Sequence, residues 1–457
     1  MPKNNGLKLA VGVCAAVMAT SAAAQVETTY VLMASKWGQA QANAVTAAGG
    51  TVRFSHNASG LAVAKSTNPD FLKAALAGGA IADGTVDFAL NLALPVRTAD
   101  LTADAVNPDD DRFFKGIQWA PQAVKAPAAW AKGYTGKGVR VAVIDGGNFN
   151  THPDLAANVD SAAGRSFVEG APGSCEVQFN CDTGTFWHGT HVAGIIAALD
   201  NTIGVVGIAP DATIVPVKVL HNGSGSFAAV IQGIIYSAMP VSQGGGGAHI
   251  INMSLGADFP RGGREAASLT SGLNRAVNFA ASQGVLVLSA AGNDGYDLDH
   301  TGNLITTPAQ SGNGLAVSAT GPFGFAYGNR DFTRFASYSN YGNSLVTVAG
   351  PGGDFAWPTN EFCTLPTYSP AGTVTIPCWA FDMVLSTSRA GYSWAAGTSM
   401  ATPAAAAVAA LIKQKYPNIS VGAWKNRLAN SSVDTGKRGH DPYYGRGFIN
   451  AEAAVAD

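Results

Sequence analysis

The sequence predicts an α/β protein: a main domain with a mainly parallel sheet covered by helices on both faces, preceded by a small α+β unit. Two observations predict this architecture. From about Ile117 onward, continuous apolar segments alternate with stretches of helical periodicity, which is typical of buried parallel strands joined by helices. Residues 30–97 instead order their segments as β-α-β-β-α-β, the split βαβ arrangement.

Composition limits the class of protein. Hydrophobic residues make up 47% of the 457 residues and charged residues only 13%, a balance that excludes an intrinsically disordered chain. The formal net charge of -2 gives nucleic acid or anionic lipid no general attraction. We therefore expect the function to reside in a localised site, without a nucleic-acid partner.

The N-terminus has the order of a secretory signal. Lys3 and Lys8 precede an apolar run from Leu9 to Met18, and small residues follow as far as Ala24. The run is too short and too rich in small residues for a transmembrane anchor. We expect a signal peptide over residues 1–24, cleavage after Ala24, and a secreted protein without a membrane anchor, extracellular or periplasmic.

The secondary structure of the small unit is predicted from the spacing of its apolar residues and from its turn residues. Short β-prone runs predict strands, and two stretches with helical spacing, the first ended by Gly49 and Gly50, predict helices. The expected strands are Tyr30–Ala34, Thr51–Phe54, Leu61–Ala64 and Val86–Leu92, and the expected helices are Gln39–Ala48 and Pro69–Ala77. The polar segment from Val96 to Asp111 is predicted to be a linker.

The main domain contains longer apolar runs and longer helical stretches. The expected strands are Val139–Ile144, Ile214–Val219, His249–Met253 and Val285–Leu288. The expected helices are His191–Ala198, Phe227–Ala238, Glu265–Gln283 and Thr402–Lys415. The glycine run 244–247 lacks the strand and helix context of a dinucleotide site, so we interpret it as a flexible loop.

Four cysteines remain after loss of the signal peptide, which contains the fifth: Cys175, Cys181, Cys363 and Cys378. An even number in an exported chain favours disulfides, and four cysteines allow three pairings. We favour the local pairing of Cys175 with Cys181 and of Cys363 with Cys378, because it closes short loops. A zinc site is the alternative, but neither pair has the C-x-x-C spacing that such sites favour.

Four segments carry residues with catalytic potential. Asp145 ends the first strand of the main domain, at the edge where open α/β sheets assemble their sites. His188 opens the run His-Gly-Thr-His-Val-Ala-Gly, in which His191 is more typical of a structural histidine. Ser399 opens a helix in Gly-Thr-Ser-Met-Ala-Thr-Pro, where the helix dipole favours developing negative charge. Asn293 follows a buried strand in Ala-Ala-Gly-Asn. Taken singly, the aspartate could belong to a turn and the serine could be a helix cap.

Taken together, these segments resemble the subtilisin-like serine proteases, whose catalytic residues follow the same order along the chain. The resemblance extends from about Pro121 to Ala454. It implies a secreted serine endopeptidase with a subtilisin-like catalytic domain over residues 111–457. Such an enzyme hydrolyses peptide bonds with broad specificity through an Asp-His-Ser triad and an acyl-enzyme intermediate, and it needs no catalytic cofactor. Polypeptides would be the substrates, and the protein would act as a monomer.

The resemblance also assigns roles. Ser399 would be the nucleophile, His188 the general base and Asp145 the residue that orients it. Asn293 and the Ser399 backbone N–H would hold the oxyanion. Gly146 and Gly147 stand where the family has a serine or threonine followed by glycine, so a local hydrogen bond that helps to position the aspartate is lost.

Substrate-binding segments are implied by the same resemblance. An exposed strand resembles the one that pairs with extended substrates by β-augmentation. A second strand and the segment before Asn293 resemble the two walls of the primary specificity pocket. The residues concerned are Gly223, Ser224 and Gly225, then Ser254, Leu255 and Gly256, and then Ala290, Ala291 and Gly292. Their small side chains predict a pocket without a fixed charge, which prefers apolar or large uncharged side chains.

A structural calcium ion is also implied. One loop resembles that by which relatives bind calcium through an Asn side chain and carbonyl oxygens, which are hard ligands of the preferred kind. The expected ligands are Asp154, Leu199, Asn201, Ile203 and Val205, with Asp110 or Asp111 as an N-terminal ligand. An ordinary surface turn is the alternative.

The small unit resembles the family's inhibitory propeptides, so residues 25–110 are expected to be a propeptide with its linker and an intramolecular inhibitor. The alternative is a permanent accessory domain. The cysteine-bearing insertions, around 175–181 and 355–381, are expected near the rim of the active site. Two other functions are alternatives: a catalytically silent binding module, which would have lost at least one catalytic residue, and a metal hydrolase, for which no H-E-x-x-H motif exists.

Overall fold

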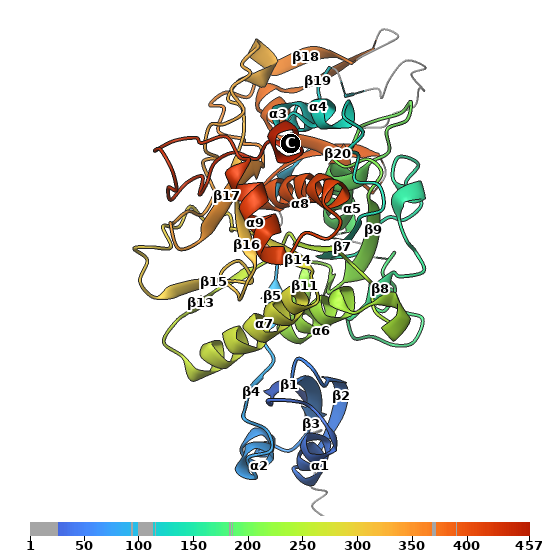
Figure 1. The fold of residues 1–457 in the computed structure, drawn as a ribbon, viewed down its shortest axis with the longest axis vertical. Coiled ribbons are helices and arrows are strands. Elements are labelled where there is room, and N and C mark those ends of the chain that lie inside the picture. Colours follow the sequence, from blue (N-terminus) through green and yellow to red (C-terminus); the bar gives the residue numbers. More distant parts are fainter. Residues whose placement is uncertain are drawn as a thin grey trace, which may run out of the picture.

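The computed structural model describes residues 26–92, 95–98, 113–114, 116–181, 184, 186–367, 372–389 and 391–457. The predicted signal peptide and most of the predicted linker, including Asp110 and Asp111, lie outside the described residues. Figure 1 shows a large α/β domain with a small unit beneath it, next to helices α6 (Phe227–Ala238) and α7 (Arg264–Ser282).

The main domain is built on a seven-stranded sheet with the order β17-β16-β14-β12-β7-β9-β8. Every neighbouring pair in it is parallel, as predicted. Its strands are β7 (Arg140–Asp145), β8 (Arg165–Ser166), β9 (Thr213–Lys218), β12 (Ile250–Met253), β14 (Leu286–Ala290), β16 (Leu315–Thr320) and β17 (Val346–Pro351). Of these strands, β7, β9, β12 and β14 correspond to the apolar runs predicted as strands, whereas β8, β16 and β17 were not predicted.

Helices cover both faces of this sheet because its strands are apolar on both sides. Val141 and Val143 of β7 belong to the core formed with α5 (Phe186–Ala197) and α8 (Thr398–Lys415). Ala142 and Ile144 belong to the core formed with α6 and α7. Alternate residues of one strand therefore bury into opposite layers, as the period of a strand requires.

Shorter elements complete the main domain. The helical ones are α3 (Ala120–Ala123), α4 (Ala126–Trp130), η1 (Ala156–Asn158), η2 (Val241–Gln243), η3 (Phe325–Tyr327), η4 (Cys378–Asp382), α9 (Val421–Asn430) and α10 (Ala451–Ala454). The strands are β10 (Leu220–His221), β11 (Ser224–Ser226), β13 (Ala257–Pro260), β15 (Leu304–Thr307), β18 (Phe362–Thr367), β19 (Gly372–Pro377), β20 (Val384–Thr387) and β21 (Tyr392–Ala396).

The small unit has the predicted β-α-β-β-α-β order and forms an antiparallel sheet, β2-β3-β1-β4. Its elements are β1 (Thr28–Met33), α1 (Gln39–Ala47), β2 (Gly50–His56), β3 (Leu61–Ser66), α2 (Phe71–Ala77) and β4 (Asp83–Val86). Tyr30 and Leu32 pack with α1 and α2, whereas Val31 and Met33 join the core that contains α6 and α7. The sheet thus has an internal face and a face buried against the main domain.

One prediction about the end of this unit was wrong. The strand expected over Val86–Leu92 is divided: β4 ends at Val86, and β5 (Ala89–Asn91) pairs with β11 of the main domain. At the start of the predicted linker, β6 (Val96–Arg97) pairs with β21. β11 and β21 of the main domain provide the main-chain hydrogen-bond partners of β5 and β6, and the residue pattern of β5 and β6 does not reveal these partners.

Both favoured disulfides are present, Cys175–Cys181 and Cys363–Cys378. The second joins the antiparallel hairpin of β18 and β19 to η4. Figure 1 places this hairpin at the end of the molecule opposite the small unit. Phe355, near the start of the insertion, reaches the cavity described below.

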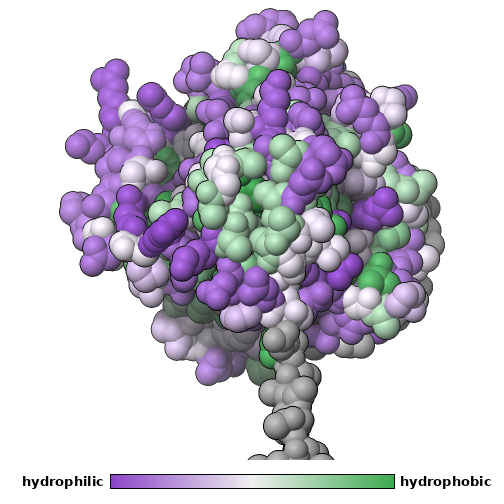
Figure 2. Space-filling model, turned by 90° about the horizontal axis from the view of Figure 1, so that it is seen from below, coloured by the Kyte–Doolittle hydropathy of each residue, from purple (hydrophilic) through white to green (hydrophobic). Residues whose placement is uncertain are grey.

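Figure 2 shows the molecule from below, where polar side chains surround a limited central group of apolar residues. Within the described part of the chain, no helix combines the length and the apolar character needed to cross a membrane.

Candidate active site

Asp145 and His188 meet at the carboxyl edge of the central sheet. Asp145 is the last residue of β7, and His188 lies in the first turn of α5. His188 Nδ1 is 3.0 Å and 2.9 Å from the two carboxylate oxygens, and both side chains are 0% exposed. With the Nδ1 proton donated to the carboxylate, Nε2 is left as the basic nitrogen of the ring.

Backbone groups fix this pair without the hydroxyl that the sequence lacks. The Gly146 N–H donates to Asp145 Oδ1 at 2.7 Å. Gly147 has a φ of 104°, which favours glycine, and a Cβ on Gly189 would come within 2.1 Å of the Gly147 carbonyl oxygen. The small residues at the start of α5 are therefore required for its close approach to the end of β7.

Ser399 is the second residue of α8, a helix whose alanine-rich N-terminal part is buried in the core. Its Oγ donates to the Ser254 carbonyl oxygen at 3.2 Å, while the Ser254 hydroxyl donates to the Ser399 carbonyl oxygen at 2.8 Å. Pro403 explains the second bond. It has no N–H for the carbonyl four residues earlier, so Ser254 supplies the missing donor.

The hydrogen bond between Ser399 and His188 is not formed in this structure. His188 Nε2 is buried and has no hydrogen-bond partner among the residues that the structure describes. α5 and α8 nevertheless pack against each other, so both side chains belong to one region. Hydrogen bonds of this kind are often long in free enzymes and tighten when a substrate binds.

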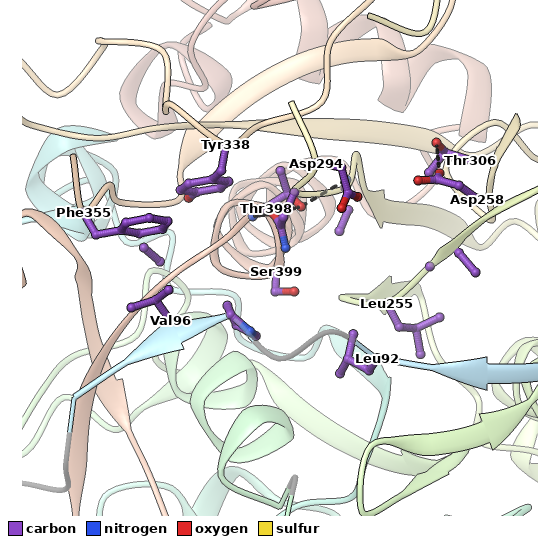
Figure 3. Close-up of a pocket in the computed structure, with 17 residues that line it drawn as sticks. Leu92, Val96, Leu255, Asp258, Asp294, Thr306, Tyr338, Phe355, Thr398 and Ser399 are labelled. Atoms are coloured by element: carbon purple, nitrogen blue, oxygen red, sulfur yellow. Dashed lines mark hydrogen bonds between the residues drawn. The ribbon is translucent and has the colours of Figure 1, made fainter. Parts of the chain in front are cut away.

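Asn293 is oriented by the first residue of α8. Its Oδ1 accepts from the Thr398 N–H and from Thr398 Oγ1, both at 2.8 Å. Since the oxygen is held by Thr398, the Nδ2 group remains as a donor beside the cavity that Asn293 lines with Ser399. Figure 3 shows Thr398 and Ser399 at this cavity.

The cavity has a volume of about 260 Å³. Leu255, Gly256, Ala290 and Gly292 line it, as the sequence analysis expected for the walls of a specificity pocket. Ala291 does not line it: its side chain is buried in a separate apolar cluster.

Two carboxylates also line this cavity, so the prediction of a pocket without a fixed charge was wrong. They belong to Asp258, on β13, and to Asp294, directly after Asn293. Burial raises the pKa of Asp258, partly offset by its hydrogen bond from Thr306, and the nearby charge of Asp294 raises it further. The prediction rested on the small residues Gly256 and Gly292 and did not consider Asp258 and Asp294, which lie two residues after them.

The edge strand predicted at 223–225 is occupied by the chain's own β5. Gly225 of β11 pairs with Leu90, and the Leu92 N–H donates to the Gly223 carbonyl oxygen at 2.8 Å. Leu92 and Val96 then line the cavity on either side of Ser399 (Figure 3). β5 thus lies on β11 and β6 lies on β21, with Leu92 and Val96 at the cavity between them.

The expected calcium ligands cluster around a buried carboxylate. Asp154 is fully buried and accepts hydrogen bonds from Asn201 Nδ2 at 2.9 Å and from the Val205 N–H at 3.0 Å. The carbonyl oxygens of Leu199, Ile203 and Val205 accept no hydrogen bond from the residues that the structure describes. Buried carboxylate and free carbonyl oxygens are the donor set that suits calcium.

The other two histidines of this region have structural surroundings. His191 Nε2 donates to the Ser393 carbonyl oxygen at 2.9 Å, and burial lowers its pKa to about 3. His152 Nε2 bonds with the Gly391 carbonyl oxygen, and burial lowers its pKa as well. Across the described ranges, no group of three or more His, Cys, Asp or Glu side chains is placed to hold a metal.

This combination of fold and site is that of a serine endopeptidase. Comparison with known proteins identifies the family: residues 136–447 match the model of the Subtilase family, and the chain belongs to that family. Subtilisin Savinase from Lederbergia lenta is 38% identical over 342 residues, which cover 75% of this chain and 99% of the relative. M-protease from Shouchella clausii is 39% identical over 342 residues, covering 75% of this chain and 70% of the relative.

A solved structure extends the likeness to most of the chain. The epidermin leader peptide processing serine protease from Staphylococcus aureus matches with a TM-score of 0.71 and 21% identity. The match covers 94% of this chain and 97% of that protein. At this identity the likeness concerns the fold.

Proposed function

We propose that the protein is a secreted endopeptidase that cleaves polypeptides through Ser399, His188 and Asp145. The contact of the buried Asp145 carboxylate with His188 Nδ1 carries this proposal, because it leaves Nε2 as a base near α8, a helix whose second residue is Ser399. The N-terminus of α8 adds a dipole that favours the negative charge of an acyl-transfer intermediate.

In the proposed reaction, Ser399 Oγ leaves the Ser254 carbonyl oxygen, transfers its proton to His188 Nε2 and attacks the peptide carbonyl carbon. The oxyanion that forms accepts hydrogen bonds from Asn293 Nδ2 and the Ser399 N–H. His188 then protonates the leaving amine, and water hydrolyses the acyl-enzyme by the same steps. Asp145 stabilises the imidazolium in both halves of the reaction.

Broad sequence tolerance is expected from the groove. β11 recognises an extended segment through main-chain hydrogen bonds, and such bonds do not depend on the substrate's side chains. The cavity beside Ser399 adds a preference at one position only.

A serine-directed fluorophosphonate probe tests the nucleophile. We expect one covalent adduct per mature molecule, located by mass spectrometry at Ser399, and no adduct with Ser399→Ala. Ser432→Ala is a matched control, since that hydroxyl bonds with a carbonyl oxygen near the end of α9, far from the cavity. An adduct at another serine, or none in active protein, would contradict the proposal.

We further propose that residues 25–110 form an inhibitory propeptide with its linker, between a signal peptide (1–24) and the catalytic domain (111–457). Support comes from two strands that precede the main domain: β5 lies on β11 and β6 lies on β21, on either side of Ser399. While these strands remain in place, no other polypeptide can pair with the same edges.

The small unit also contacts two helices of the main domain, one of them at its N-terminus. Asp87 Oδ1 accepts from the Ala228 N–H at 2.9 Å, at the start of α6, and the Asp83 carboxylate accepts from the Ser268 hydroxyl of α7 at 2.9 Å. Carboxylates at helix N-termini are stabilised by the helix dipole. These contacts hold the unit against the main domain and favour inhibition in cis.

A structural calcium ion is proposed at the loop 199–205. Asp154, Asn201 and the carbonyl oxygens of Leu199, Ile203 and Val205 would hold it, and the ion would stabilise the loop without taking part in the chemistry. The Phe113 N–H donates to the Gly204 carbonyl oxygen, so the start of the main domain also reaches this loop.

A further inference from the structure

The cavity beside Ser399 is acidic in a way that neither the proposed reaction nor the proposed inhibition uses. Asp258 and Asp294 line it, and no lysine or arginine does so among the residues that the structure describes. The other lining groups are apolar or carry hydroxyl and amide groups. A cavity with two carboxylates and no counter-ion creates a negative potential where a substrate side chain would enter.

Asp258 is held in place by strand pairing. β13 and β15 form an antiparallel pair in which Asp258 lies directly opposite Thr306, and the Thr306 hydroxyl donates to Asp258 Oδ1. Asp258 Oδ2 has no hydrogen-bond partner within the described part of the chain, so one carboxylate oxygen remains available to a ligand. Figure 3 shows Asp258 beside Thr306, on the same side of Ser399 as Leu255 and away from Phe355.

The position of Asp258 selects the length of the side chain that can reach it. Figure 3 places Asp258 away from Ser399, toward the side of the cavity opposite Phe355. A short side chain next to the cleaved bond leaves this end unfilled, whereas a long one can bring its terminal group to Asp258. Asp294 lies nearer the serine and is exposed, so its charge is more strongly screened by water.

We infer that this protease prefers substrates with arginine or lysine immediately before the cleaved bond, and that Asp258, assisted by Asp294, determines the preference. The inference deepens the proposed function and rests on it. A guanidinium or ammonium group would donate to Asp258 Oδ2 and replace the missing counter-ion, and hydrogen bonds to a charged partner are about twice as strong as neutral ones. Apolar side chains would leave a partly buried carboxylate without compensation.

The residues of the proposed propeptide and linker that line the cavity do not match this preference. Between Leu92 and Val96 the sequence has no basic residue. The contacts of the small unit with α6 and α7 hold β5 on β11 in cis, so self-processing depends less on a charge in the cavity than the cleavage of an added substrate does. Removing Asp258 should therefore change the cleavage of added substrates more than it changes self-processing.

Peptide anilides that are identical except for the residue before the cleaved bond test the inference. Arginine and citrulline differ in charge but hardly in shape, and leucine serves as an apolar reference. For the mature wild type we expect kcat/KM to be about 10- to 100-fold higher for arginine than for citrulline. Asp258→Asn, which keeps an acceptor for Thr306, should reduce this ratio about tenfold, and Asp294→Asn should reduce it by a smaller factor.

Asp211→Asn is the matched control, since Asp211 also accepts a hydrogen bond from a threonine, Thr135, but lies outside the cavity. It should leave the ratio unchanged. The charge reversal Asp258→Lys should favour glutamate before the cleaved bond, a gain that mere structural damage would not produce. Self-processing of each variant, followed by mass spectrometry, verifies folding.

Equal rates for arginine and citrulline in the wild type, with hydrolysis dependent on Ser399, would overturn this inference and leave the proposed function standing. The same holds if the ratio is high but unaffected by Asp258→Asn and Asp294→Asn together. Hydrolysis that does not depend on Ser399 would overturn the proposed function, and the inference with it.

Discussion

Asn293 offers a quantitative test of the proposed chemistry. Its side-chain oxygen is held by the Thr398 N–H and the Thr398 hydroxyl, both at 2.8 Å, so its amide N–H has one defined direction beside Ser399. Asn293→Ala removes that donor and leaves the Ser399 N–H in place. Loss of one oxyanion donor typically lowers kcat by about 10²- to 10³-fold, or about 3 to 4 kcal/mol in the barrier. We expect this loss with little change in KM, because the donor acts on the transition state.

Thr398→Val separates orientation from donation. It removes one neutral hydrogen bond to Asn293 Oδ1 and keeps the backbone one, so a loss of about fivefold is expected, since such bonds contribute about 1 kcal/mol. The assay is steady-state hydrolysis of a peptide anilide by matured enzyme, with kcat and KM determined separately. If Asn293→Ala loses less than about fivefold in kcat, or raises KM alone, the oxyanion assignment is refuted.

Three further outcomes follow from single carboxylates. Chelation of calcium should lower the melting temperature, and Asp154→Asn should lower it equally and abolish the effect of the chelator; a chelator-insensitive wild type would contradict the proposed ion. Burial raises the pKa of Asp382 to about 6 from 3.8, so the folded state binds the extra proton between these values. The unfolding free energy of Ser399→Ala should therefore decrease, relative to that of Ser399→Ala/Asp382→Asn, as the pH rises from about 4 to 6. A difference between the two variants that does not change with pH would contradict this prediction. Asp87→Asn weakens a charge-assisted contact at the start of α6 and should shorten the lag before activity appears by about tenfold. Asp70→Asn, in the small unit but away from this contact, should leave the lag unchanged. Equal lags for the two variants would contradict the proposed role of Asp87 in holding the small unit against the main domain.

Much of the main domain was accessible from the sequence because its signals are local. Continuous apolar runs predicted β7, β9, β12 and β14, and the segments around Asp145, His188, Asn293 and Ser399 indicated where strands end and helices begin. The start of α6 agrees with the prediction, but the two helices that carry His188 and Ser399 begin earlier than predicted: α5 begins at Phe186, and α8 begins at Thr398 and includes Pro403. That proline is tolerated because the Ser254 hydroxyl, distant in sequence, satisfies the carbonyl that it leaves without a donor.

The remaining features depend on contacts between distant segments. No pattern within residues 86–92 shows that the chain leaves one sheet at Asp87 and joins another at Ala89, because the partner strand β11 lies more than a hundred residues away. The charge of the cavity depends likewise on Asp258, which strand pairing with Thr306 brings to it. The small residues in the two walls carried no information about the acidic residues that follow them.

The most direct test of the account compares the intact mass and N-terminal sequence of the purified wild type with those of Ser399→Ala, both expressed from the full chain. We expect the wild type to lose the small unit together with its linker, residues 25–110, while Ser399→Ala keeps them and retains β5 on β11. Retention of the unit by an active wild type, or its loss from both proteins in a host free of other proteases, would contradict a propeptide removed by the protein's own serine.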